Sequence, residues 1–494
     1  VVAPLIEKIS TSANAINKTA TIKFKVTDKY FKASTITEDN IKVFVNGTET
    51  TEGITKTLSS TDLKEDRVSG ETTTNVQYGV EYTLTVTGFA TSADQVKIQI
   101  PAGLVTDNYS NSNIATEIIA YNVLKKTYTG EYDTNTNSES RADAPFLGNT
   151  SIQRQNIDNI TFTDNIPADV GYDETAQSYK NATTWDVSAR GDKSILAWYT
   201  TNANGSVKVY IGSDAEIFAN QDSTDLFTFV GYSSKATSTE TITNIDLLNV
   251  TSVTNMRDMF RYTGYNAMTE LNLGNKFDTS NVTNMYYMFD HTGYNAMTEL
   301  NLGNKFDTRN VTNMRSMFYE CGDTAMTSLD LGDKFDTSNV TNMSGMFMDT
   351  GWTSMTSLKL GDKFDTSSVT NMDSMFASTG YTAMTSLDLG DKFNTSSVTN
   401  MNYMFSRTGG KAITSLNLGD KFDTSNVTTM KFMFDRAGYT AMTELNLGDK
   451  FDTSSVTDMS YMFKECGYTV MTSLDLGDKF DTSKVTDMQQ MFYK

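Results

Sequence analysis

The side chains that could do chemistry in this sequence are mostly carboxylates and aromatic rings, because histidine and cysteine are almost absent. The chain has one histidine, His291, and two cysteines, Cys321 and Cys466. No nucleophile and base stand in a recognisable catalytic arrangement with this histidine, and no zinc-type spacing of cysteine and histidine occurs. We therefore assign no catalytic residue and expect a binding or structural protein, not an enzyme.

The same motif returns every 29 residues from about residue 241 to the end of the chain. A Met-Phe pair closes each unit, and a fixed period of this size is typical of stacked repeats. The phenylalanines of these pairs are Phe260, Phe289, Phe318, Phe347, Phe376, Phe405, Phe434, Phe463 and Phe492.

Two rows of side chains, with one residue from each repeat, are the candidates for contact with a ligand. The first row lies on the expected strand of each repeat and is polar: Asn272, Asn301, Asp330, Lys359, Asp388, Asn417, Asn446 and Asp475. The second row is aromatic, broken at Asp323 and Gly410: Tyr265, Tyr294, Trp352, Tyr381, Tyr439 and Tyr468. Stacking between neighbouring repeats would explain the aromatic row, and a strip that binds sugars or peptides is the alternative.

Two acidic rows raise the question of a metal. One runs through Asp278 and its equivalents, and the other through Asp333 and its equivalents. Ca²⁺ takes carboxylate and carbonyl oxygens, so a calcium ladder is an alternative. Capping of backbone amides explains the first row better, and we assign no metal and no cofactor.

Within one repeat, the pattern predicts a strand, a turn and a short helix. Leu271 and Leu273 alternate with polar neighbours, as in a half-buried strand. Capping residues follow at 278–280, and the apolar residues of 282–289 then recur at helical spacing. Neighbouring packed helices lie about 8–10 Å apart, whereas neighbouring strands lie about 4.8 Å apart. The stack should therefore curve, with its strands on the concave side.

Four positions in each repeat differ freely from one unit to the next. Two lie between the paired methionines, as at Tyr286 and Tyr287, and two follow the phenylalanine, as at Asp290 and His291. On the expected helix they face away from the core. Solvated helix surface is one interpretation of this variation, and a recognition face is the other.

The region before the repeats divides into three parts. Residues 1–127 alternate apolar and polar residues in short runs, which predicts an antiparallel β-sandwich. Residues 128–143 are polar and are expected to form a linker. Residues 144–240 contain strand-like segments that do not repeat, among them a hairpin around 202–205, and we assign them as the N-terminal cap of repeats 241–494.

The repeat motif resembles a known family. NIDLLNVTSVTNMRDMF (244–260) and LDLGDKFDTSNVTNMSGMF (329–347) are similar to the BspA-like leucine-rich repeats of bacterial surface proteins. IPAGLVTDNYSNSN (100–113) resembles bacterial immunoglobulin-like modules. The resemblance implies an N-terminal all-β Ig-like sandwich followed by a capped α/β leucine-rich-repeat solenoid with 29-residue repeats. Such proteins bind partners on the strand face, which makes the polar row the first choice of binding surface.

Composition narrows the partners. The formal net charge of −20 argues against nucleic acid, which needs a basic surface, and no apolar run is long enough to cross a membrane. With the resemblance, we expect an adhesin that binds a protein or glycan on host or bacterial surfaces, and that is secreted or attached to the cell wall. A self-assembling surface or fibre protein is the alternative. We also expect the natural chain to continue beyond Lys494.

Overall fold

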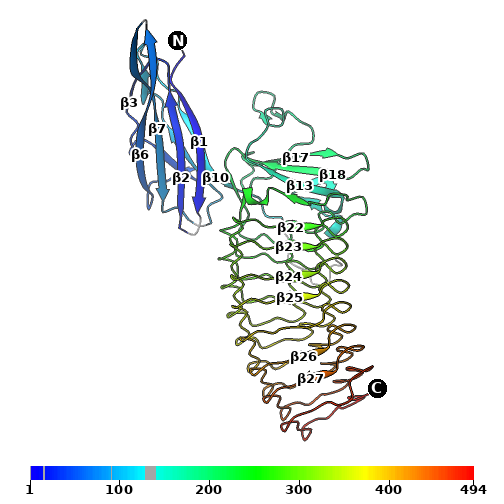
Figure 1. The fold of residues 1–494 in the computed structure, drawn as a ribbon. Coiled ribbons are helices and arrows are strands. Elements are labelled where there is room, and N and C mark those ends of the chain that lie inside the picture. Colours follow the sequence, from blue (N-terminus) through cyan, green and yellow to red (C-terminus); the bar gives the residue numbers. More distant parts are fainter. Residues whose placement is uncertain (1, 15–16, 70, 91, 128–140, 494) are drawn as a thin grey trace.

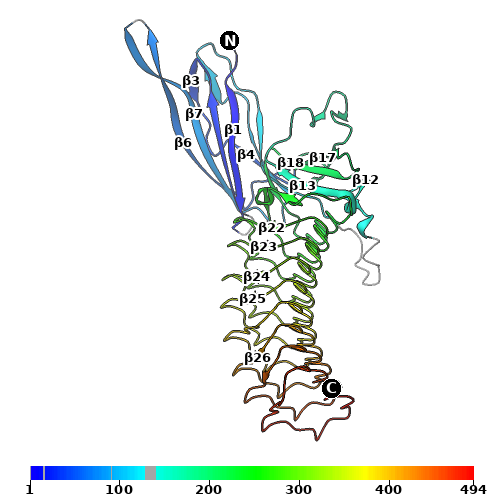
Figure 2. The ribbon, with the colours of Figure 1, turned by 45° about the vertical axis from the view of Figure 1, so that its right-hand side comes forward.

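In the computed structural model, the chain forms a two-sheet β-structure at one end and a column of repeat layers at the other (Figure 1). The structure describes residues 2–14, 17–69, 71–90, 92–127 and 141–493. Residues 144–240, which we call the lead-in region, lie between the two parts. The column, which we call the repeat stack, extends away from the lead-in region in both views (Figure 2).

The first N-terminal sheet has four antiparallel strands in the order β1-β2-β7-β6. Its strands are β1 (Leu5–Asn14), β2 (Thr19–Thr27), β6 (Thr55–Ser69) and β7 (Thr72–Thr87). On β2, Ala20, Ile22, Phe24 and Val26 are buried and the residues between them are not, as the alternation in the sequence predicts.

The second sheet continues from the N-terminal part into the repeats, in the order β21-β19-β10-β8-β4-β5. Its strands are β4 (Lys42–Val45), β5 (Thr48–Glu49), β8 (Gln95–Ile100), β10 (Thr116–Val123), β19 (Glu216–Phe218) and β21 (Leu248–Asn249). A short pair, β3 (Phe31–Ser34) and β9 (Val105–Asp107), lies beside these sheets. Kinship with Ig-like domains stays a prediction.

Strand β19 joins the N-terminal core to the core of the stack. It pairs in parallel with β10 on one side and with β21 on the other. Neighbouring side chains on a strand point to opposite faces. Accordingly, Ile217 packs into the core of the lead-in region and stack, whereas Phe218 packs into the N-terminal core. Most of the predicted linker, residues 128–140, lies outside the described residues, and this shared sheet is one connection between the two parts that the structure describes.

The lead-in region is built around a five-stranded sheet in the order β16-β17-β18-β13-β20. The predicted hairpin is confirmed: β17 and β18 are antiparallel, with Thr201 opposite Val207. Besides β19, the strands and 3-10 turn of this region are β11 (Pro145–Phe146), β12 (Asn149–Gln153), η1 (Arg154–Asn156), β13 (Ile157–Thr163), β14 (Tyr172–Asp173), β15 (Ser178–Tyr179), β16 (Trp185–Asp186), β17 (Leu196–Thr201) and β18 (Val207–Gly212). Strand β20 (Ile242–Thr243) and the 3-10 turn η2 (Ile245–Leu247) follow it at the start of the repeats.

Each 29-residue repeat is one layer of the stack, and equivalent residues lie above one another. Short strands pair in parallel across neighbouring layers, so that Leu271 lies opposite Leu300. These strands are β22 (Glu270–Asn272), β23 (Glu299–Asn301), β24 (Ser328–Asp330), β25 (Ser357–Lys359), β26 (Ser415–Asn417) and β27 (Glu444–Asn446). The phenylalanines of the Met-Phe pairs stack with ring centroids 5.4 to 5.6 Å apart. The predicted stacking of row upon row is confirmed.

The prediction of a capped α/β leucine-rich-repeat solenoid is wrong. The structure is nearly all β, and no described residue of the repeats lies in an α-helix. The stretch predicted as helix instead hydrogen-bonds to the next layer. The backbone N–H groups of Met285 and Phe289 donate to the carbonyls of Asn313 and Met317, at 3.1 and 2.8 Å. Without helices, the argument for a concave strand face no longer holds.

A chain of three-residue turns takes the place of the helix. The N–H of Met288 donates to the carbonyl of Met285, three residues before it, at 3.2 Å. Within these turns, Tyr287 and His291 have φ angles of +57° and +55°, a left-handed conformation that an α-helix excludes. Apolar residues spaced by three suit both arrangements, and the segment is too short for a helix to be stable by itself.

The lead-in region supplies one more layer that the sequence search at a period of 29 missed. Phe227 stacks on Phe260 with ring centroids 5.3 Å apart, and Phe229 stacks on Tyr262 at 4.7 Å. The N–H of Phe227 donates to the carbonyl of Met259 in the manner of the later layers. The offset here is 33 residues, so only a comparison of DLFTFVGY with DMFRYTGY would reveal the match.

Candidate binding surface

The polar strand row is exposed but has a structural task. All eight side chains lie at the surface, as predicted. Except for Lys359, each accepts a hydrogen bond through its side-chain oxygen from the N–H of the glycine two residues later, at 2.9 to 3.1 Å. Lys359 Nζ lies 3.4 Å from Asp330 Oδ2. The restriction to Asn and Asp in this row therefore follows from the turn, whether or not a ligand binds there.

The aromatic row consists of three stacked pairs. The ring centroids are 4.8 Å apart for Tyr265 and Tyr294, 4.5 Å for Trp352 and Tyr381, and 5.1 Å for Tyr439 and Tyr468. One layer without an aromatic ring separates each pair from the next. The rings are half-buried, apart from Tyr468, which is 40 % exposed. Stacking thus accounts for the pairs but leaves ring surface accessible.

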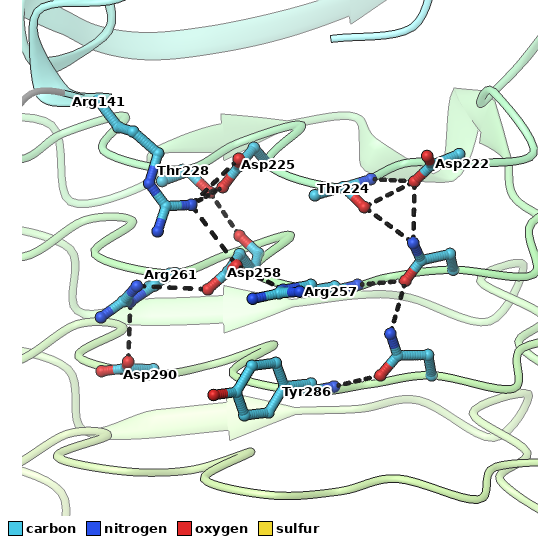
Figure 3. Close-up of polar contacts among 12 residues, drawn as sticks. Arg141, Asp222, Thr224, Asp225, Thr228, Arg257, Asp258, Arg261, Tyr286 and Asp290 are labelled. Carbon is cyan, nitrogen blue, oxygen red and sulfur yellow. Dashed lines mark hydrogen bonds and ion pairs between the residues drawn. The ribbon is translucent and has the colours of Figure 1, made fainter. Parts of the chain in front are cut away.

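A line of charged side chains lies close to the aromatic row. Most of them occupy the freely varying positions of the repeats, whereas Asp323 interrupts the aromatic row itself and two members precede the repeats. We call this line the charged column, and it consists of Arg141, Asp225, Asp258, Arg261, Asp290, His291, Glu320, Asp323 and Asp349. Its upstream half alternates in sign (Figure 3). Arg141 Nη1 lies 2.8 Å from Asp225 Oδ1 and 3.5 Å from Asp258 Oδ2, and Arg261 Nε lies 2.8 Å from Asp290 Oδ2. Arg141 thereby fastens the end of the predicted linker to the first two layers.

Sequence reasoning missed this column. Most of its ion pairs join residues from different layers, and only the register between layers brings these residues together. Asp258 and Asp290 are fully buried at positions where the expected helix would have faced water. The signal that could have found them is the coincidence of Arg261, Asp290, His291 and Glu320 in neighbouring repeats, with opposite charges at adjacent positions.

His291, which the sequence places at a freely varying position facing away from the core, lies between two carboxylates. Its Nδ1 contacts Asp290 Oδ1 and its Nε2 lies 2.9 Å from Glu320 Oε2. The ring packs against Tyr262 at 4.4 Å, and its side chain is only 13 % exposed. Burial by itself would lower the pKa of His291, but the two hydrogen bonds and the negative charges outweigh it and raise the pKa to about 9.

Replacing His291 by serine is expected to weaken the dependence of stability on alkaline pH. Serine occupies the equivalent position at Ser378 with the same left-handed backbone, so the exchange should not strain the chain. The folded-state pKa of His291, about 9, lies above the ordinary value of about 6.5. Its stabilisation is therefore complete below pH 6.5 and is lost as the pH rises through 9. The urea midpoints of the native protein and of His291→Ser, measured at pH 6 and pH 9.5, test this. If the midpoint fell equally in both proteins between these pH values, the prediction would be contradicted.

The downstream half of the column is acidic. Burial, together with repulsion from Glu320 and Asp349, raises the pKa of Asp323 to about 6. Burial also raises the pKa of Asp349 to about 6, with a hydrogen bond to Ser378 and a contribution from Arg407 in the opposite direction. The charges that act on Asp323 are thus two carboxylates and His291, which is already paired with Glu320.

Of the two acidic rows that suggested calcium, the first binds backbone amides. In the row of Asp278, the carboxylate accepts the N–H of the residue two positions later, for example Ser280 at 3.1 Å and Ser338, from Asp336, at 3.0 Å. Within the described residues, no group of three or more His, Cys, Asp or Glu side chains is placed to hold a metal ion. No described helix is long and apolar enough to span a bilayer.

Comparison with known proteins identifies the repeats. A family model described as "Mycoplasma protein of unknown function, DUF285" matches residues 230–350, 323–438 and 410–494. Together these matches run from 230 to 494, more than half of the chain, and the first begins in the layer supplied by the lead-in region. No curated protein and no solved structure matches the chain.

Proposed function

The chain belongs to the DUF285 family, and from this premise we propose that it is a surface protein whose repeat stack binds a macromolecular partner. The partner is a protein or glycan on a host or bacterial surface, and the chain acts outside the cell, secreted or attached to the envelope. The likeness of its repeat motif to BspA-like bacterial surface proteins supports this location. Its role is adhesion, not catalysis.

The observation that carries this proposal is the contrast between constant and variable rows. The buried Val, Met and Phe rows keep their residue types through the layers, with few exceptions. The second position after the phenylalanine is at least partly exposed in most layers, and it changes from Glu320 and Asp349 to Arg407 in others. A constant scaffold with changing surface residues suits recognition along a preformed face, because little ordering entropy is lost on binding.

A binding screen with the whole chain tests the proposal. Host matrix proteins, glycans and bacterial cells would be arrayed and probed with the native chain and with two variants. The first variant carries Tyr319→Ala and Glu320→Ser, which copy the residues of another layer. The second, a matched control, carries Asp388→Asn in the strand row. We expect the first variant to lose capture of the partner and the second variant to retain it. Capture of nothing by the native chain would contradict the proposal.

Self-assembly is the second candidate, favoured by one aromatic strip. Tyr403, Phe432 and Tyr461 stack with centroids 4.7 and 4.3 Å apart at variable positions, and Tyr403 is 37 % exposed. Such a strip could bury itself against a second copy. Sedimentation at increasing concentration would show association that Tyr403→Ser, which copies Ser374, abolishes.

A further inference from the structure

We propose that the cleft between the N-terminal sheets and the lead-in region binds an extended segment of a partner protein as an added β-strand. We call it the edge cleft, and it is lined by β1, β8, β10 and the lead-in residues 166, 192–194 and 213–215. The segment pairs with β10 at residues 116–119. This site lies outside the repeat stack, so it is an interaction beyond the proposed function.

One edge of β10 is paired along only part of its length. On the side of β8, the pairing runs from Thr116 to Asn122. On the opposite side, β19 pairs only with residues 121–123. Within the described residues, no other strand pairs with this second edge, so the backbone groups of 116–119 that point away from β8 lack a strand partner. A strand edge of this kind is a template for an incoming chain, because its backbone groups supply the hydrogen bonds.

The unpaired part of this edge faces the edge cleft. Strand β10 lies beside β1, on the side of the N-terminal part that faces the lead-in region (Figure 1). Residues 116–119 all line the cleft, whose volume is about 590 Å³. Side chains alternate between the two faces of a sheet, so four successive residues border one cavity when the strand presents its edge to it. Accordingly, Ile118 packs into the N-terminal core, whereas its neighbour Glu117 is exposed.

The adjoining position on the same edge is already filled by a strand of the chain itself. Glu216 in β19 pairs with Tyr121 through the backbone, and its Oε2 accepts the N–H of Ala13 in β1 at 2.7 Å. Strand β19 therefore bridges β10 and β1. Residues 213–215, which precede it, line the cleft and do not pair with β10. A strand bound in the cleft extends the existing interface between β10 and β19 toward the start of β10.

The lining favours a peptide that is mainly uncharged and carries apolar side chains at alternate positions. Two of the charged side chains in the lining have partners within the chain. Lys97 Nζ lies 2.8 Å from Glu117 Oε2, and Asp192 Oδ2 accepts a hydrogen bond from Gln95 Nε2 at 2.8 Å. The apolar part of the lining consists of Ile6, Ile118, Ile119, Ile166 and Ala215. Four strand residues span about 13 Å, so a segment of roughly four to six residues fits this edge.

Selection from a peptide library tests the inference. Phage that display random nine-residue peptides are selected on the immobilised full chain, and the enriched peptides are synthesised with a fluorescent label and titrated against it. Ala215→Trp, which fills the edge cleft, should weaken their binding at least tenfold. Ala203→Trp is the matched control and should change it less than twofold, because Ala203 is exposed in the turn between β17 and β18, at the end of that hairpin remote from the cleft.

Two measurements on the unsubstituted chain test the mode of binding. Hydrogen exchange should slow at residues 116–119 when a selected peptide is bound. The N–H groups of a strand point alternately to its two edges, and only one edge of the peptide can pair with β10. N-methylation of one alternate set of peptide amides should therefore weaken binding at least tenfold, whereas methylation of the other set should change it less than twofold.

The inference is overturned if no peptide is enriched, if Ala215→Trp and Ala203→Trp have equal effects, or if exchange at 116–119 does not change. Association of the chain with itself that Ala215→Trp abolishes, without any binding of peptide, would also overturn it, because the occupant would then be a second copy. The proposed function is tested separately by the stack variant with Tyr319→Ala and Glu320→Ser, which should bind the selected peptides as the native chain does.

Discussion

Replacing Phe218 by alanine is expected to lower the free energy of unfolding by about 3–5 kcal/mol, the usual cost of removing a large aromatic side chain from a core. Phe218 is 1 % exposed and packs against Tyr121 with ring centroids 4.7 Å apart. Its neighbour Ile217 belongs to the other core, so the loss would fall on the strand that holds the two parts together.

The variant should also separate the unfolding of the N-terminal sheets from that of the stack. Hydrogen exchange in urea would follow residues 17–69 and 250–493 independently. In the native protein we expect both regions to exchange together, and in Phe218→Ala the N-terminal region first. Val68→Ala, at a side chain that is 72 % exposed, is the control and should change neither. If the N-terminal region of Phe218→Ala had the same urea midpoint as that of the control, Phe218 would not couple the N-terminal sheets to the repeat stack.

Replacing Gly322 by alanine is expected to destabilise the stack by about 2–5 kcal/mol. The residue has φ +55°, and a left-handed alanine costs roughly 1–2 kcal/mol. A Cβ there would also lie 2.6 Å from the Cβ of Met326, and overpacking of this kind costs about 1–3 kcal/mol. Met326 is fully buried, so it has little room to move aside.

Gly332, ten residues later in the same repeat, separates these two contributions. Its φ is +72°, but an added Cβ would meet nothing within 4 Å. Gly332→Ala should therefore cost only the conformational part, about 1–2 kcal/mol. Thermal unfolding of both variants provides the measurement. Equal losses would mean that the contact with Met326 relaxes and that only the backbone conformation matters.

Much of the scaffold could be predicted because it depends on patterns within one repeat. The spacing between Phe289 and Phe318 gives the number of residues in one layer. The alternation of apolar and polar residues around Leu271 gives the position of its strand. The helix was predicted wrongly because Val282, Met285 and Met288 recur at three residues, a spacing that a chain of turns shares. The left-handed backbone at Tyr287 and the hydrogen bonds to the next layer distinguish the two, and the sequence of one repeat shows neither.

The candidate surface was predicted less well than the scaffold because it depends on neighbours from different repeats. The exposure of the strand row could be predicted because its polar residues alternate with buried leucines, a pattern that is visible within each repeat. The pairing of His291 with Glu320, and the burial of Asp290, depend on which unlike residues the register places together. The sheet shared by β10, β19 and β21 was missed for the same reason, since its strands come from three separate regions.

The bonding of each layer to the next through its backbone bears on how such a chain can evolve. An amide of one unit finds its acceptor at a fixed offset in the following unit, as Met285 does with Asn313. Loss or duplication of one whole unit would leave every remaining donor with an equivalent acceptor. Descendants of this gene could therefore lengthen or shorten the repeat stack in single steps of about 4.8 Å. Each step would bring its own set of outward-facing residues for selection to act upon.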